Sequence, residues 1–60
     1  MDRLLTVEEV SEIFGVDNFY VTHTLCNIKG FPYIKIKRRY FFDATLLKEW
    51  IVKNQGLEFL

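Results

Sequence analysis

The sequence predicts a mainly α domain with a small β-hairpin, in the order helix, helix, hairpin, helix. Two apolar patterns at helical spacing are separated only by a short turn at Gly15, and a third follows Asp43. Between them, residues 33–42 are rich in β-branched and aromatic side chains, as strands are. Because a chain of 60 residues buries only about 60% of the surface its unfolded form exposes, we expect residues 1–60 to form a single domain with a thin core.

The first helix is expected over Val7–Phe14. Thr6 is a suitable N-cap, and Glu9, three residues later, completes a capping box. Gly15 then supplies the left-handed residue that commonly ends a helix. The expected apolar face repeats at helical spacing and contains Val7, Val10, Ile13 and Phe14.

The second helix is expected over residues 17–27, with Asp17 as its N-cap. If Val21 faces the core, a rotation of about 100° per residue fixes the direction of every other side chain on the helix. The inward residues are then Val21, Thr24, Leu25 and Ile28, and the outward residues are Phe19, Thr22, His23, Cys26 and Asn27. The outward face is therefore mostly uncharged.

A β-hairpin is expected from residues 33–36 and 40–42, with three consecutive basic residues, 37–39, at its tip. One side of both arms should pack on the helices, and we expect Tyr33 and Tyr40 to pack as well. No Gly or Asn marks the turn.

The last helix is expected to begin after Asp43, its N-cap, and to end by Gly56. The predicted apolar stripe of this helix consists of Leu46, Leu47, Trp50 and Ile51. Residues 57–60, Leu-Glu-Phe-Leu, are too apolar for a free tail. They are expected either to fold back onto the core or to contact a partner.

The net charge is zero, but the charges are unevenly distributed. Residues 1–18 carry one Arg and five acids, whereas residues 19–39 carry five Lys or Arg and no acid. This segregation predicts a dipolar molecule with one basic face.

Apolar runs of at most three residues argue against a membrane span. A single cysteine, Cys26, and a single histidine, His23, argue against a disulfide and a structural metal. We expect a soluble cytoplasmic protein without cofactors.

Two helices joined by a tight turn and followed by a basic ribbon predict a winged helix-turn-helix, in which the second helix enters a DNA groove and the ribbon reaches phosphates. Candidate base-reading residues lie in the first turns of the second helix and are Asn18, Phe19, Thr22 and His23. Candidate phosphate-binding residues lie on the wing and are Lys35, Lys37, Arg38 and Arg39.

Each candidate also has a structural interpretation. Phe19 either contacts thymine methyl groups or is buried under a neighbouring loop. His23 is either a base reader or an ordinary surface histidine, and no catalytic motif surrounds it. Cys26 is interpreted as a small, semi-buried apolar residue, and the alternative is a reactive thiol whose pKa a basic neighbourhood would lower. The basic tip either binds phosphates or protects an exposed strand edge.

Several short motifs occur along the chain in a fixed order, and it is this order that carries a family resemblance. They are Leu4-Leu5-Thr6-Val7-Glu8-Glu9-Val10, Gly15-Val16, Pro32, Ile34-Lys35-Ile36, Arg38-Arg39-Tyr40 and Leu47-Lys48-Glu49-Trp50. Over about residues 4–52 the chain thus resembles the excisionase-type, MerR-like winged-helix domains. The resemblance implies a non-enzymatic protein of bacterial, phage or mobile-element origin. Such a protein binds duplex DNA as a recombination directionality factor or a small transcriptional regulator, with the second helix in the major groove and the wing against the backbone or minor groove.

Three departures from the family pattern refine this expectation. The second helix has no Arg or Lys, so most of the affinity should come from the wing. Lys37 stands where the family often has Gly, which costs about 1 kcal/mol if that position has a positive φ. About one extra residue lies between Val21 and Pro32.

A single copy should bind DNA weakly, so tight binding is expected to need several copies, self-association through the tail, or fusion to a larger protein. The alternative function is a protein-protein interaction adaptor on the same scaffold.

Overall fold

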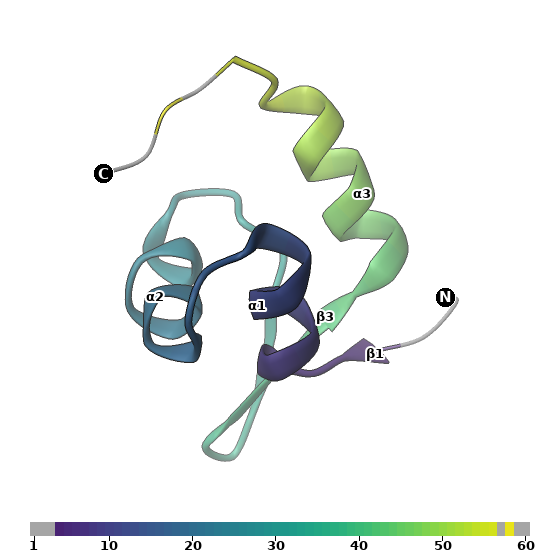
Figure 1. Ribbon diagram of the computed structural model, residues 1–60. Helices are drawn as coiled ribbons and strands as arrows, with labels where there is room; N and C mark the ends of the chain where they lie inside the picture. The colour runs from purple at the N-terminus through teal and green to yellow at the C-terminus, as the bar shows by residue number, and fades with distance from the viewer. Residues whose placement is uncertain (1–3, 57, 59–60) are drawn as a thin grey trace.

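The structure is a computed structural model that describes residues 4–56 and residue 58. In this part of the chain the helices are α1 (Val7–Phe14), α2 (Asn18–His23), a short 3₁₀-helix η1 (Leu25–Asn27) and α3 (Ala44–Lys53). The strands are β1 (Leu4–Leu5), β2 (Ile34–Ile36) and β3 (Arg39–Asp43), joined in an antiparallel sheet of order β1-β3-β2. Figure 1 shows α1 between α2 and α3, with the β2–β3 hairpin extending away from the helices. The predicted winged helix-turn-helix fold is confirmed.

Local hydrogen bonds at the helix ends explain why α1 and α3 begin where the sequence predicts. The Glu9 amide donates to Thr6 Oγ1 at 3.2 Å, and the Thr6 amide donates to Glu9 Oε1 at 3.0 Å. This capping box satisfies two amides that the helix itself leaves without partners. Gly15 ends α1 in the left-handed region, with φ of 70°. Asp43 caps α3 by accepting from the amides of Thr45 and Leu46 at 2.9 and 3.1 Å.

The second helix, α2, is shorter than predicted, and the residues after it form a 3₁₀-helix instead of continuing the α-helix. Asp17 caps it by accepting from the Tyr20 amide at 2.8 Å, as expected. At Thr24 the backbone reaches φ −114° and ψ −59°, and the chain continues as η1. A 3₁₀-helix advances 120° per residue instead of 100°, so the helical phase is lost after Thr24. Cys26, predicted to face outward, is therefore turned into the core and is only 6% exposed.

The hairpin has the two predicted strands, but only one of them packs against the core. Ile36 pairs with Arg39, which leaves a two-residue turn at 37–38. β2 is an edge strand, and all three of its residues are exposed, so the prediction that both arms pack on the helices is wrong. Only β3 reaches the core, through Phe42. Accordingly Tyr40 is half-buried, whereas Tyr33 is exposed. The two tyrosine rings pack against each other at a tilt, with their centroids 5.5 Å apart.

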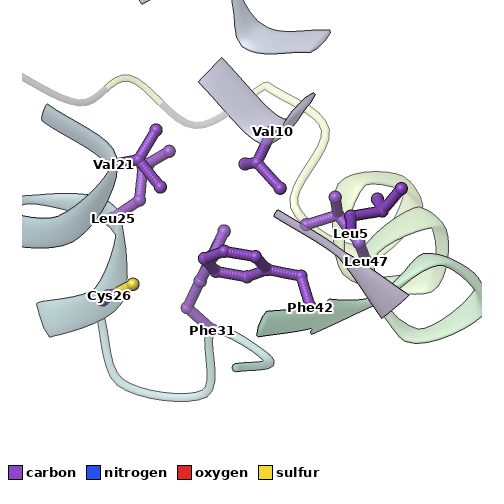
Figure 2. Packing of buried hydrophobic residues seen from close by; sticks show 8 residues of the cluster. All are labelled: Leu5, Val10, Val21, Leu25, Cys26, Phe31, Phe42 and Leu47. Atoms are coloured by element: carbon purple, nitrogen blue, oxygen red, sulfur yellow. The ribbon is translucent and has the colours of Figure 1, made fainter. Parts of the chain in front are cut away.

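The core lies where the three helices meet β3. Phe42 is fully buried, and Figure 2 shows its ring beside that of Phe31 at the centre of the cluster. The two rings meet edge to face at 6.1 Å, and Trp50 meets Phe31 in the same way at 4.8 Å. β1, which the sequence did not predict, adds Leu5 by pairing it with Phe42. Among residues 4–56 and 58, the buried apolar residues are Leu5, Val10, Val21, Leu25, Cys26, Phe31, Phe42 and Leu47.

Two predicted core positions are wrong. Ile13 on α1 is 55% exposed and Leu46 on α3 is 51% exposed. Each lies at the edge of its helix's apolar stripe, and no other element of residues 4–56 covers those edges. Helix α3 ends at Lys53, and Gly56 follows in a turn with φ of 86°. The predicted role of the tail at residues 57–60 lies outside the described residues, apart from Glu58.

Candidate nucleic-acid interface

A hollow of about 570 Å³ lies between the helix-turn-helix pair and the β2–β3 hairpin, which we call the wing. One side is formed by α2 and η1, the other by the wing, and the floor by the first turn of α1. The lining residues are Thr6, Val7, Glu8, Thr22, His23, Asn27, Arg38, Arg39, Tyr40 and Phe41. The fold thus brings together two predicted base readers, Thr22 and His23, and two predicted phosphate binders, Arg38 and Arg39.

The other predicted site residues lie outside this hollow but remain exposed. Asn18 and Phe19 form the start of α2, one turn before Thr22. Lys37 is at the tip of the wing. Lys35 sits opposite Tyr40 in the strand register, with its ammonium group 5.2 Å from the centre of the Tyr40 ring.

Positive charge covers both faces of the wing. The Arg39 guanidinium lies 5.4 Å from the centre of the Phe41 ring, on the face opposite to Lys35, because successive strand residues point to opposite sides. Such cation–π contacts hold a long cationic side chain over an aromatic face without neutralising it. None of the four wing cations forms an ion pair with residues 4–56 or 58. Both faces and the tip can therefore meet an external anion.

Comparison with known families gives a match over residues 4–55, which covers most of the chain, to the helix-turn-helix domain. The chain belongs to the helix-turn-helix domain family. Membership indicates DNA binding by a domain type that is typically non-enzymatic. Comparisons with curated proteins and with solved structures gave no match.

None of the helices in residues 4–56 and 58 could span a bilayer. Within the same residues, no group of three His, Cys, Asp or Glu side chains is placed to hold a metal ion.

The exposed face of α2 carries a stacked pair of rings. Phe19 is 68% exposed, so its burial under a neighbouring loop is excluded. Its ring lies parallel to the imidazole of His23, with centroids 3.9 Å apart and an interplanar angle of 13°. The pair has the i, i+4 spacing that places two side chains on one face of a helix.

Hydrogen bonds fix the orientation of the imidazole. His23 Nδ1 lies 3.2 Å from the Phe19 carbonyl oxygen and 2.9 Å from Thr22 Oγ1. A carbonyl oxygen only accepts, so the contact with Phe19 is a hydrogen bond in the tautomer whose Nδ1 carries the hydrogen. The Thr22 hydroxyl is also within reach of the carbonyl oxygens of Asn18 and Phe19, at 3.2 and 3.3 Å. Because its hydroxyl is used within α2, Thr22 offers a base mainly its methyl group.

Asn27 lines the hollow, but sequence reasoning did not select it. It was predicted to face outward, and it does, although η1 and not α2 places it there. Its Nδ2 donates to the His23 carbonyl oxygen at 2.7 Å, which leaves Oδ1 facing away from that bond as an acceptor. An uncharged side chain four residues after His23 was the only signal available in the sequence.

Cys26 takes no part in this interface. The alternative of a reactive thiol, with a pKa lowered by basic neighbours, is wrong, because burial raises the pKa of the Cys26 thiol from 9.0 to about 11. Desolvation is the cause, because burial disfavours the charged thiolate. The thiol is therefore a protonated, apolar core group at neutral pH.

Proposed function

We propose that this protein binds double-stranded DNA without catalysing a reaction, as an excisionase-like recombination directionality factor or a small transcriptional regulator. The observation that carries the proposal is the hollow between α2 and the wing. One side presents the side chains of Thr22, His23 and Asn27, and the other presents Arg38 and Arg39. Bases are read by the first kind of surface and phosphates are held by the second. The excisionase-like character of the matched family supports the same proposal.

In the proposed complex, α2 enters the major groove and the wing contacts the flanking backbone. The major groove, about 12 Å wide, admits one α-helix. Because α2, with the sequence NFYVTH, has no Lys or Arg, most phosphate contacts fall to the wing. Three or four such contacts would make log affinity fall with log salt concentration at a slope of about −3 to −4, taking −0.9 per phosphate.

Tight binding is proposed to need more than one copy, or fusion to a larger protein. The domain measures 31 × 25 × 20 Å, and one turn of duplex is about 34 Å long. A single copy therefore spans less than one turn and reads few base pairs. Side-by-side copies would add contacts without enlarging the domain. Removing residues 57–60 tests whether the tail links them, since cooperative binding that survives the truncation would exclude the tail.

The proposal is tested by fluorescence anisotropy on a mixed-sequence duplex over a range of salt concentrations. Arg38→Ala and Arg39→Ala are compared with Lys48→Ala and Lys53→Ala, which remove exposed charges from α3, away from the hollow. Each wing variant should weaken binding to all sequences alike and make the slope less steep by about 0.9. The α3 variants should change neither quantity.

Two outcomes would contradict the proposal. Equal losses from the wing and α3 variants would mean that binding follows net charge and uses no defined surface. No binding to any duplex at low salt would favour the adaptor, in which Arg38 and Arg39 meet an acidic protein. Circular dichroism of each variant is the control, and it should show an unchanged fold because the substituted positions are exposed.

A further inference from the structure

Phe19 is the most exposed of the large apolar side chains in the described part of the chain. The core residues of α2, such as Val21, are buried, so the helix has no need of Phe19 for its own packing. An exposed aromatic ring at the start of α2 is available for an apolar contact with a partner, because it offers a large apolar area in a rigid side chain.

Neighbouring groups fix the orientation of the Phe19 ring before any partner binds. His23 stacks against one face of Phe19 at 3.9 Å, and the imidazole is itself fixed by its Nδ1 contacts to the Phe19 carbonyl oxygen and Thr22 Oγ1. Little rotamer freedom is left for the pair to lose on binding. His23 also lines the hollow, so the stack connects the start of α2 to the surface that faces the wing.

Among the groups on the floor of the major groove, the apolar one is the C5 methyl of thymine. Phosphates carry charge and are matched by the wing, which leaves an apolar ring without a role towards them. We propose that the Phe19–His23 stack is a thymine-methyl reader, in which Phe19 contacts the methyl group and His23 positions the Phe19 ring. This inference rests on the proposed function and specifies which base α2 recognises.

The test uses duplexes enriched by the protein from a random-sequence pool and then amplified once with dTTP and once with dUTP. Uracil differs from thymine only by the missing methyl, and loss of one buried methyl should weaken binding of the unaltered protein about fourfold. Because uracil also alters duplex shape, the ratio of the two affinities is measured again for Phe19→Ala. A double-mutant cycle then isolates the contact between ring and methyl.

The proposal predicts that the thymine-to-uracil affinity ratio falls towards one in Phe19→Ala and in His23→Ala. His23→Phe restores a stacking ring and should recover the ratio, which a general loss of binding would not do. Ile13→Ala, an exposed apolar residue on α1, is the matched control and should leave the ratio unchanged. An equal ratio in the unaltered protein and Phe19→Ala would overturn the reader while leaving DNA binding intact. Absence of binding to either pool would instead refute the proposed function.

Discussion

Replacing Lys37 by glycine should raise stability and lower DNA affinity at the same time. Lys37 is the first residue of the two-residue wing turn and has φ of 58°, the one positive value at a non-glycine position in residues 4–56 and 58. The left-handed conformation costs an L-residue roughly 1–2 kcal/mol. Glycine removes that strain but loses more backbone entropy on folding, about 0.5–1 kcal/mol. The net stabilisation is therefore about 0.5–1 kcal/mol.

Thermal unfolding followed by circular dichroism measures the first effect. For a domain of this size, Tm should rise by roughly 2–8 °C in Lys37→Gly. Lys37→Ala is the matched control, because it removes the charge and keeps the strained φ, and its Tm should stay close to that of the unaltered protein. In DNA binding both variants should lose about 0.9 from the salt slope. A Tm that falls in Lys37→Gly, or rises equally in both variants, would refute the strain argument.

Three further predictions concern the fold. Thr6→Ala removes the N-cap of α1 and should cost about 1 kcal/mol, measured by urea unfolding, and an unchanged midpoint would contradict the role of the capping box. Phe42→Ala should unfold the domain at room temperature, since such a truncation costs roughly 3–5 kcal/mol, while the half-buried neighbour variant Phe41→Ala should stay folded by circular dichroism. The Cys26 thiol should resist alkylation by iodoacetamide at pH 8 until urea is added. Its folded pKa is raised, so the contribution of Cys26 to stability should be fully present below pH 9 and be lost as the pH rises towards 11, because the unfolded thiol ionises first. Rapid alkylation of the folded protein would contradict this account.

Features set by neighbouring residues could be predicted from the sequence. The capping box of Thr6 and Glu9, the glycine stop at Gly15 and the N-caps Asp17 and Asp43 each depend on residues within a few positions, and the structure contains all of them. Helical periodicity likewise gave the bounds of α1. These elements determine the order of the fold.

Features set by distant residues could not be predicted. The change to 3₁₀ geometry after Thr24 has no local signal, yet it moves Cys26 from the surface to the core. β1 has only two residues and exists because β3 offers Leu5 a partner in Phe42. Exposure of β2 also follows from topology, since an edge strand beyond the helices has nothing to pack against.

The same distinction applies to the candidate site. Charge counting selected Arg38 and Arg39, and helical spacing selected Thr22 and His23, but only the fold shows that these four line one hollow. Neither the use of the Thr22 hydroxyl within α2 nor the stacking of Phe19 on His23 follows from spacing alone. Side-chain rotamers depend on the local backbone and on neighbouring groups, which a residue pattern does not specify.

The most direct test of the central claim is to map amide chemical-shift changes while mixed-sequence duplex DNA is added to the protein. If α2 and the wing form the DNA-binding surface, the largest changes will be at residues 18–27 and 35–41, around the hollow. The amides of α3 will change little. Changes confined to α3 and the exposed face of α1, or no changes at low salt, would contradict the account.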